Sequence, residues 1–143
     1  MIYIYTDGAC SGNPGIGGWG AVILIEKKDP IFLNGGHKKT TNNRMELIAA
    51  IKAISYFKAK KDLEIFTDSK YLKDGIESWI HKWKINGWKT ANKKPVKNKD
   101  LWIELDKEIG KHNILWNWVK GHANNKYNEK ADSLARKYIE EIN

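Results

Sequence analysis

The apolar pattern of the chain changes its period after Asn43, and this change limits the possible folds more than any other feature of the sequence. Before Asn43, three short apolar runs at 2–6, 19–25 and 31–33 are separated by turn-forming residues. Such runs with short connections are typical of strands in an antiparallel meander. After Asn43, apolar residues recur at helical spacing, which predicts amphipathic helices. The chain is therefore expected to begin as a meander and then to add helices.

Strands and helices alternate in the second part of the predicted structure. Two further apolar runs, at 63–67 and 114–119, predict strands that follow helical segments. The predicted order is βββ-α-β-α-α-β-α, with helices near 47–57, 72–83, 101–109 and 131–138. This order predicts an α/β fold with helices packed on a mixed sheet. Because neither a repeat nor a linker interrupts 1–143, we expect a single domain.

The composition excludes several classes of protein. Apolar residues make up 41% of the 143 residues, which suffices for a core and excludes a disordered chain. The single cysteine, Cys10, excludes an internal disulfide and favours a reducing compartment. Neither a signal peptide nor an apolar stretch approaching the ~18 residues of a membrane span is visible. We therefore expect a cytoplasmic monomer with no membrane partner.

Four acidic residues at the ends of predicted elements are candidates for a shared site. Asp7 ends a strand that looks buried on both faces, where a lone carboxylate is costly unless it is paired or binds a metal. Glu46 shares an apolar helix face with Ala50. Asp68 follows the fourth predicted strand, and active sites collect at the carboxyl ends of strands in open α/β sheets. Asp132 lies in the last predicted helix.

Each of these acids also has an ordinary structural explanation. Asp7 fits a turn acid in an Asp-Gly pair. The Asn-x-x-Glu pattern at 43–46 resembles a capping box. Asp68 fits a helix N-cap, and Asp132 fits a solvated i,i+4 pair with Arg136. The argument for a site therefore depends on all four acids meeting at one point, which a mixed sheet allows.

Four carboxylates at one point indicate a particular kind of ligand. Carboxylate oxygens suit hard cations, and the chain has one cysteine and four histidines, so Mg²⁺ or Mn²⁺ is favoured over zinc. Without a metal, like charges at such short range repel one another strongly. The sequence therefore predicts a divalent-metal site at Asp7, Glu46, Asp68 and Asp132.

The positive charge of the chain is concentrated in one segment. The net charge is +8, and no acid stands between Glu77 and Asp100. Removing the seven lysines of that segment from the 25 basic residues leaves 18, against 17 acidic residues. Lysines interleaved with tryptophans suit a nucleic-acid backbone, although a solvated face and core tryptophans would give the same pattern. The lysines are Lys82, Lys84, Lys89, Lys93, Lys94, Lys97 and Lys99, and the tryptophans are Trp79, Trp83 and Trp88.

His122 lies in a polar loop between the last predicted strand and helix. A histidine titrates near neutral pH, so it suits proton transfer, although a lone loop histidine is more often a plain surface residue. The glycine-rich segment after Asp7 matches neither a Walker nor a dinucleotide-binding pattern. A hairpin is its ordinary role, and close approach of backbone amides to nucleic acid is its functional alternative.

At these same positions the sequence closely resembles bacterial type 1 ribonuclease H. The matching blocks follow the family's order over almost the whole chain, and together they are highly specific. They are Tyr5-Thr6-Asp7-Gly8-Ala9-Cys10, Asn13-Pro14-Gly15, Thr41-Asn42-Asn43-Arg44-Met45-Glu46, Thr67-Asp68-Ser69, Trp79-Ile80 with Trp83, Gly87-Trp88-Lys89-Thr90, Trp118-Val119-Lys120-Gly121-His122-Ala123, and Asn128-Glu129 with Asp132.

The resemblance implies a ribonuclease H-like fold, a five-stranded mixed sheet in the order 3-2-1-4-5 flanked by helices. It implies endonucleolytic cleavage of the RNA strand of an RNA–DNA hybrid, which leaves 5′-phosphate and 3′-hydroxyl ends. Asp7, Glu46, Asp68 and Asp132 match the family's metal ligands, and His122 matches its histidine for proton transfer or product release. The segment at about 79–99 resembles the family's basic protrusion, which grips the DNA strand.

The resemblance also implies which residues contact the substrate. Selection of the RNA strand would depend on its 2′-hydroxyl groups, and phosphate binding would make affinity fall steeply with salt. Lys70 stands where many relatives carry a glutamine that contacts the minor groove of the hybrid, so that contact is in question. The candidates are Cys10, Asn13, Asn42, Asn43 and Lys70 for strand selection, and Thr41, Trp79, Trp83, Lys84, Trp88 and Lys89 for phosphate gripping.

As a hypothesis, two Mg²⁺ ions sit roughly 4 Å apart among the four carboxylates, with Mn²⁺ as a substitute. Asp7 would bridge both ions. Two other functions stay open. A DNA nuclease or recombinase of the same fold would differ in substrate, and an inactive hybrid-binding module would lack a metal ligand.

Overall fold

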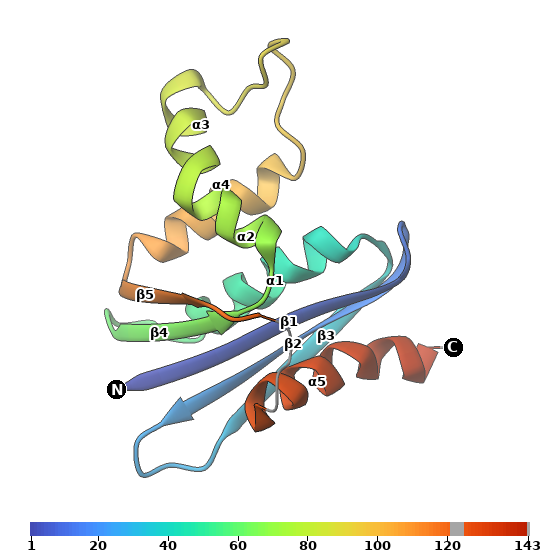
Figure 1. Cartoon of the computed structure of the whole chain (residues 1–143), viewed down its shortest axis with the longest axis vertical. Helices are drawn as coiled ribbons and strands as arrows, with labels where there is room; N and C mark the ends of the chain where they lie inside the picture. Colours follow the sequence, from blue (N-terminus) through green and yellow to red (C-terminus); the bar gives the residue numbers. More distant parts are fainter. Residues whose placement is uncertain (121–124, 143) are drawn as a thin grey trace.

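A computed structural model of the protein describes residues 1–120 and 125–142. The chain begins with a meander of three long strands and continues with alternating helices and strands (Figure 1). The elements are β1 (Ile2–Gly12), β2 (Gly15–Ile25), β3 (Ile31–Thr40), α1 (Asn42–Ser55), β4 (Asp62–Thr67), α2 (Lys70–Asp74), the π-helical η1 (Gly75–Trp79), α3 (Ile80–Asn86), α4 (Lys99–Ile109), β5 (Asn113–Trp118) and α5 (Lys126–Ile142).

The described strands form one five-stranded sheet in the order β3-β2-β1-β4-β5, which confirms the predicted fold class and strand order. β1 pairs antiparallel with β2, and β2 pairs antiparallel with β3. β1 pairs parallel with β4, and β4 pairs parallel with β5. The carboxyl ends of β1, β4 and β5 therefore lie toward the same edge of the sheet, where open α/β sheets place their sites.

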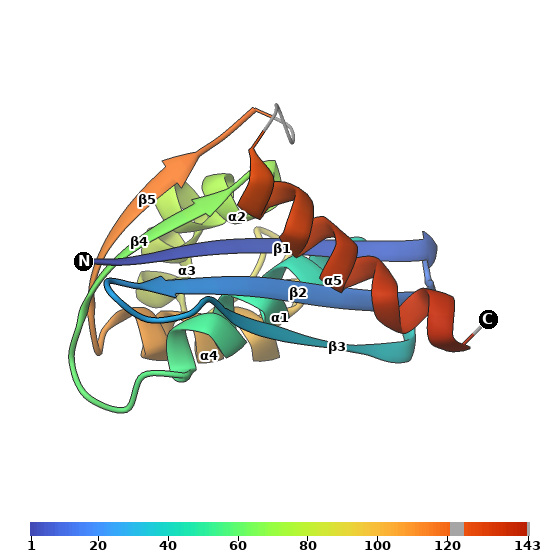
Figure 2. The ribbon, with the colours of Figure 1, turned by 90° about the horizontal axis from the view of Figure 1, so that it is seen from below.

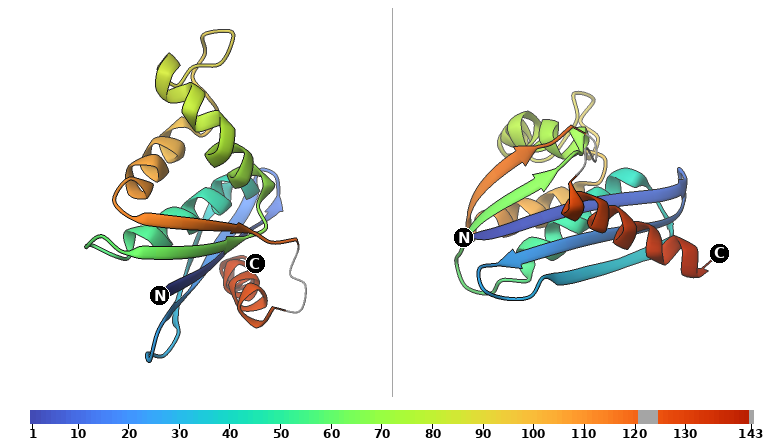
Figure 3. Two further views of the ribbon diagram at one scale, coloured as in Figure 1. Left: turned by 60° about the vertical axis from the view of Figure 1, so that its left-hand side comes forward. Right: turned by 60° about the horizontal axis from the view of Figure 1, so that its bottom comes forward.

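Helices cover both faces of the sheet. α1 packs against β1 and β2 on one face, and α4 packs against α1. α5 crosses β1, β2 and β3 on the opposite face, as Figure 2 and the left view of Figure 3 show. α3 and the loop after it project away from the sheet (Figure 1). We call residues 79–99 the protrusion.

The main core lies between the sheet and the α1 layer. Ile4 and Ile65 face Leu47 across this layer, and Trp102 of α4 is fully buried with them. Burying each such side chain contributes roughly 1.5–3 kcal/mol to folding. A smaller cluster with Tyr5 and Leu134 lies beneath α5. The two clusters thus hold β1 from both faces, which makes this strand a rigid support for the residues that follow Tyr5.

The first three strands are longer than the apolar runs predicted. β1 continues through Asp7 to Gly12, and β2 starts at Gly15, so the prediction that Asp7 ends its strand was wrong. The glycines of 15–20 lie in the β1–β2 ladder instead of a broad loop. At Gly20 a side chain would collide with α5, because an added Cβ would lie 2.4 Å from the carbonyl oxygen of Ala131. Packing of a helix on this face, not turn formation, explains that glycine.

The predicted helix at 72–83 is a helical segment divided into three parts. α2 and α3 flank the π-helical turn η1, which packs Gly75 against the ring of Trp102. A π-turn inserts one extra residue and changes the direction of the side chains that follow. None of the helices in residues 1–120 and 125–142 is long and apolar enough to cross a membrane.

Candidate active site

Three of the four predicted acids meet beside the middle of β1, just past the point where its parallel pairing with β4 ends. Asp7, Glu46 and Asp68 each place one carboxylate oxygen within 4.8 Å of the other two. We call these three residues the acid cluster. Asp7 and Glu46 are each only 5% exposed, whereas Asp68 is half-buried. Carboxylates this close and this buried require a counter-charge or a proton.

Asp7 lies in β1 just beyond the last parallel pair with β4, Tyr5 with Phe66. On its other side Asp7 pairs with Gly20 of β2. Where the parallel ladder ends, β1 and β4 diverge and the Asp7 side chain gains room beside the end of β4. The amide of Gly8 donates to Asp7 Oδ1 at 2.9 Å and fixes the carboxylate.

Glu46 enters the cluster from the first turns of α1. The helix is capped by Thr41, whose Oγ1 accepts a hydrogen bond from the amide of Arg44 at 3.2 Å. The predicted capping box of Asn43 and Glu46 is therefore wrong, and the glutamate is not used by the helix end. Glu46 Oε1 is buried and has no hydrogen-bond partner among the described residues. A buried, unpartnered carboxylate oxygen is costly unless a cation binds it.

Asp68 follows the last residue of β4 directly. Ser69, not Asp68, caps α2, because its side chain accepts from the amide of Leu72 at 3.1 Å. The N-cap explanation for Asp68 is therefore wrong. The amide of Ser69 in turn donates to Thr67 Oγ1 at 3.2 Å. These bonds fix the turn that directs Asp68 toward Asp7.

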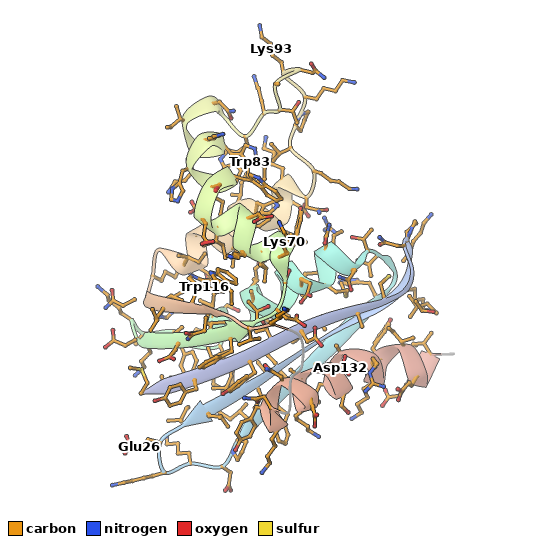
Figure 4. All side chains as sticks on the ribbon, viewed as in Figure 1. Glu26, Lys70, Trp83, Lys93, Trp116 and Asp132 are labelled. Carbon is orange, nitrogen blue, oxygen red and sulfur yellow. The ribbon has the colours of Figure 1, made fainter. Side chains whose placement is uncertain are left out.

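Asp132 approaches the cluster from α5 on the opposite face of the sheet (Figure 4). Its Oδ2 accepts from Arg136 Nε at 2.9 Å, so the predicted i,i+4 pair is present. The same carboxylate lies near enough to Asp7 to raise the pKa of that residue by its charge and a hydrogen bond. Asp132 is thus beside the acid cluster while it pairs with Arg136. The glycine at position 20 permits this arrangement, because it lets α5 approach the strands closely.

The electrostatics of the acid cluster favour bound protons or a bound cation. Burial, followed by the charge of Asp68, raises the pKa of Asp7 from 3.8 to about 8, although the Gly8 amide opposes the shift. Burial also raises the pKa of Glu46 well above its ordinary value, and the charges of Asp7 and Asp68 add to this effect. A divalent cation would replace these protons and remove the repulsion.

The donor set fits a hard divalent metal. All three ligand atoms of the acid cluster are carboxylate oxygens, as Mg²⁺ and Mn²⁺ prefer, and Glu46 Oε1 is without a partner in the described chain. Asp132 would be a further ligand because it lies beside Asp7. The site can therefore hold a metal with the residues that are present.

Several predicted strand-selecting residues gather where the β1–β2 turn meets the start of α1. Asn13 Oδ1 accepts from the amide of Asn42 at 3.3 Å, which joins the β1–β2 turn to the start of α1. The thiol of Cys10 contacts the carbonyl oxygens of Gly15 and Thr40 at 3.6 and 3.4 Å. Asn42 is exposed and Asn43 half-buried on the same turn. The Thr41 hydroxyl oxygen accepts a helix-capping bond from the amide of Arg44, and its hydrogen can donate to a ligand at the same time.

The tryptophans of the protrusion form a chain of ring contacts. Trp79 lies 5.8 Å from Trp83, and Trp83 lies 6.0 Å from Trp88, measured between ring centroids. All three are half-buried and pack against the core that holds Trp102. The core interpretation of these rings is therefore correct in part. The remaining surface of Trp79 and Trp83 borders a hollow of about 220 Å³ that Thr90 also lines.

The lysines of the protrusion differ in their surroundings. Lys84 is paired with Asp106 of α4 at 3.4 Å, so its charge is already offset. Lys89 is exposed, and Lys93 lies near the tip of the protrusion (Figure 4). Lys70 lies outside the protrusion, where β4 ends and α2 begins, and pairs with Asp74 at 3.0 Å.

Sequence reasoning missed Arg44, which connects the acid cluster to the protrusion. Arg44 lies two residues before Glu46, and its guanidinium binds Asp100 and the side chain of Asn98. Asn98 and Trp102 both donate to the hydroxyl oxygen of Tyr71 at 3.0 Å. The sequence carries no signal for this network, because its members are far apart in the chain. The predicted residue His122 lies outside the described residues.

Comparison with known proteins gives the chain its family. A family model described as RNase H matches residues 1–140. The ribonuclease H of Francisella philomiragia subsp. philomiragia is 60% identical over 141 residues, which cover 99% of this chain and 92% of the relative. The ribonuclease H of Francisella tularensis subsp. novicida has the same identity and coverage. These matches confirm the resemblance found in the sequence.

Solved structures agree with this placement. The crystal structure of LC9-RNase H1, described as a type 1 RNase H with the type 2 active-site motif, is 32% identical and has a TM-score of 0.84. The alignment covers 95% of this chain and 70% of that one. LC11-RNase H1 in complex with an RNA/DNA hybrid has the same fold, with a TM-score of 0.76 at 23% identity and 99% coverage of both chains. The protein described here therefore belongs to the ribonuclease H family.

Proposed function

We propose that the protein is an endonuclease that hydrolyses the RNA strand of RNA–DNA hybrids and leaves 5′-phosphate and 3′-hydroxyl ends. The observation that carries this proposal is the acid cluster, three carboxylate oxygens within 4.8 Å of one another in a member of the ribonuclease H family. The substrate class is supported by relatives named Ribonuclease H and by a structural neighbour solved with an RNA/DNA hybrid.

Asp7, Glu46, Asp68 and Asp132 would hold two Mg²⁺ ions during the reaction, with Mn²⁺ as a substitute. When bound, such ions activate a water for attack on a phosphodiester and stabilise the leaving oxygen. Asp7 and Glu46 are buried, so they would remain in place when the substrate binds. Arg136 would hold one oxygen of Asp132 and leave the other for a ligand. His122 would transfer a proton or assist product release.

Selection of the RNA strand would use the β1–β2 turn and the start of α1, the helix that carries Glu46. The contact between Asn13 and Asn42 brings polar groups of two elements together there. Amide side chains both donate and accept hydrogen bonds, which suits a 2′-hydroxyl group. Cys10, Asn43 and Lys70 would complete this surface. DNA lacks the 2′-hydroxyl, so a DNA strand would bind in this position less well.

The DNA strand would be gripped by the protrusion and by Thr41. Exposed lysines such as Lys89 would supply charge, and Lys84 would exchange its pairing with Asp106 for a phosphate. Trp79, Trp83 and Trp88 would supply rigid apolar surface. The chain would act as one domain and as a monomer, because a single chain supplies every residue of the acid cluster. The free Cys10 thiol fits a cytoplasmic protein.

The proposal is tested with a hybrid whose RNA and DNA strands are labelled separately. Wild type should cut only the RNA strand, and only with Mg²⁺ or Mn²⁺. Its fragments should join in a ligation reaction without prior phosphorylation, which requires 5′-phosphate and 3′-hydroxyl ends. Asp7→Asn should abolish cleavage, whereas Glu104→Gln, an exposed acid on α4, should leave it unchanged.

Duplex DNA, duplex RNA and single-stranded RNA serve as competing substrates in the same assay. Cleavage that persists in EDTA or in Asp7→Asn would contradict the metal site. Equal cutting of duplex DNA would instead favour a DNA nuclease or recombinase. Tight hybrid binding without any cleavage by the wild type would indicate an inactive binding module.

A further inference from the structure

A groove of about 320 Å³ lies between the start of α2 and the carboxyl end of β5. Asp68 forms one wall, so the groove opens directly beside the acid cluster. We call it the lysine groove, and its lining includes Asp68, Ser69, Lys70, Lys73, Trp118 and Lys120.

The groove carries more positive than negative charge. Lys70 is offset by Asp74, with which it pairs at 3.0 Å. Within residues 1–120 and 125–142, Lys73 and Lys120 form no ion pair. The charge of Asp68 is directed to the acid cluster. Two ammonium groups therefore remain for an external anion, at the edge of the sheet where cleavage is proposed.

The walls of the groove are fixed before any ligand binds. The amide of Val119 donates to the carbonyl oxygen of Thr67 at 2.9 Å, which ties the end of β5 to the end of β4. The ring of Trp118 stacks on Trp116, with centroids 5.4 Å apart and planes 4° from parallel. Both rings pack against the main core. An anion would therefore meet a rigid floor, which reduces the ordering required on binding.

We propose that the lysine groove binds a phosphate of the RNA strand next to the phosphate that is cleaved, through Lys73 and Lys120. This inference rests on the proposed function. A strand whose phosphate is held at the acid cluster has to pass Asp68, and the groove is the cationic surface that adjoins Asp68 there. Lysine binds a phosphate as a point charge, and such contacts set the register of a strand. The groove would hold the strand that is cut, whereas the protrusion would hold the other strand.

The first test compares two double variants that lose the same charge. Lys73→Gln/Lys120→Gln removes the groove cations, and Lys52→Gln/Lys107→Gln removes exposed lysines near the far ends of α1 and α4. Hybrid affinity is measured against salt concentration with the Asp7→Asn substitution in every protein, so that the substrate stays intact. The groove variant should lower the slope of log affinity against log salt by about one to two. The control should not change it.

The second test identifies the strand and the phosphate. A single neutral methylphosphonate linkage replaces one phosphate at a time, first along the RNA strand and then along the DNA strand. The nucleotide at the replaced linkage is 2′-O-methyl or deoxy. The control substrate carries the same nucleotide with an ordinary charged phosphate. At one RNA position near the cleavage site, the neutral linkage should weaken binding by the parent several-fold. The same neutral linkage should hardly weaken binding by the groove variant, because that variant already lacks the lysines that would contact this phosphate.

The inference is overturned if the two double variants have equal salt slopes, or if the coupled position lies on the DNA strand. Thermal melting checks that both double variants fold. If the groove double variant does not fold, the single variants Lys73→Gln and Lys120→Gln replace it. Failure of the proposed function would look different, because wild-type protein without the Asp7→Asn substitution would then not cut the hybrid at all.

Discussion

Arg44 and Asp100 form a two-bond ion pair between α1 and α4, with Nη2 to Oδ2 at 2.8 Å and Nη1 to Oδ1 at 3.1 Å. The hydrogen bond from Arg44 holds the pKa of Asp100 below its usual range. Arg44 lies on the turn of α1 that carries Glu46, and Asp100 follows the protrusion directly. The pair therefore sets the position of the proposed DNA-binding segment relative to the metal site.

Arg44→Gln is expected to weaken hybrid binding several-fold, because the protrusion would no longer be tied to α1. The coupling between Arg44 and Asp100 in unfolding should stay below about 1 kcal/mol, since the pair is partly exposed. A double-mutant cycle with Asp100→Asn, read in both unfolding and hybrid affinity, measures the two effects. Lys137→Gln, which removes a cation from an exposed pair on α5, is the control. Equal loss of affinity in Lys137→Gln would refute the tether.

Gly8→Ala is expected to damage the metal site through the backbone. An added Cβ would lie 2.6 Å from the amide nitrogen of Glu46 and 2.8 Å from the carbonyl carbon of Met45, so β1 and α1 would have to separate. We expect destabilisation of roughly 1–3 kcal/mol and weaker Mn²⁺ binding, measured by denaturant unfolding and by titration. Gly110→Ala is the matched control, because its nearest atom would be an ordinary 3.5 Å away. Unchanged Mn²⁺ affinity in Gly8→Ala would contradict the close-contact argument.

Asp7→Asn is expected to stabilise the metal-free protein at alkaline pH. The folded-state pKa of Asp7 is raised from 3.8 to about 8, so the folded protein holds a proton that the unfolded chain releases. Wild-type stability should therefore fall as pH rises from about 4 to about 8. Asparagine has no proton to lose, so the advantage of the variant should grow over this range. Denaturant unfolding in EDTA at several pH values measures the trend.

Glu104→Gln, the exposed control acid, should follow the wild-type pH dependence. The same experiment in saturating Mg²⁺ should reverse the order of stability, because the wild-type site would then bind metal. An Asp7→Asn protein less stable than wild type at pH 8 in EDTA would show that repulsion in the acid cluster is not a destabilising force.

Stabilisation by Mg²⁺ should itself depend on pH. The ion has to displace the proton of Asp7, whose pKa is about 8, so the apparent affinity should rise up to that pH and then level off. The increase in Tm caused by a fixed Mg²⁺ concentration should therefore be larger at pH 8.5 than at pH 6.5. Potassium chloride at equal ionic strength controls for general salt effects. A shift that is independent of pH would exclude proton displacement from Asp7.

The order of elements and the fold class were predictable from the sequence, because the spacing of apolar residues indicates which face of a helix or strand is buried. The extents of the strands were not. The predicted strand at 31–33 continues to Thr40, where the residues after Leu33 are polar or glycine. Pairing with β2 extends this strand, and neighbouring strands supply hydrogen bonds that no local pattern records.

The helix caps show the same limit at the site itself. Asn43 and Asp68 are both acceptable N-caps by residue type, yet Thr41 and Ser69 cap the helices. The observed caps lie two residues before Asn43 and one residue after Asp68. This small difference decides whether Glu46 and Asp68 serve the helix ends or are left for the acid cluster. Because several polar residues stand side by side, only the backbone path decides which one caps the helix.

By itself the sequence determined the kinds of residues that the site contains, the order of the elements, and the place of the basic segment. These follow from residue chemistry and apolar spacing, which are local properties. Only the tertiary structure decided that Asp7, Glu46 and Asp68 place oxygens within 4.8 Å of one another, that Arg44 joins Asp100, and that Lys73 and Lys120 border the groove beside Asp68. Such distances depend on strand pairing and helix packing between residues far apart in the chain, and each side chain's direction is set by that packing.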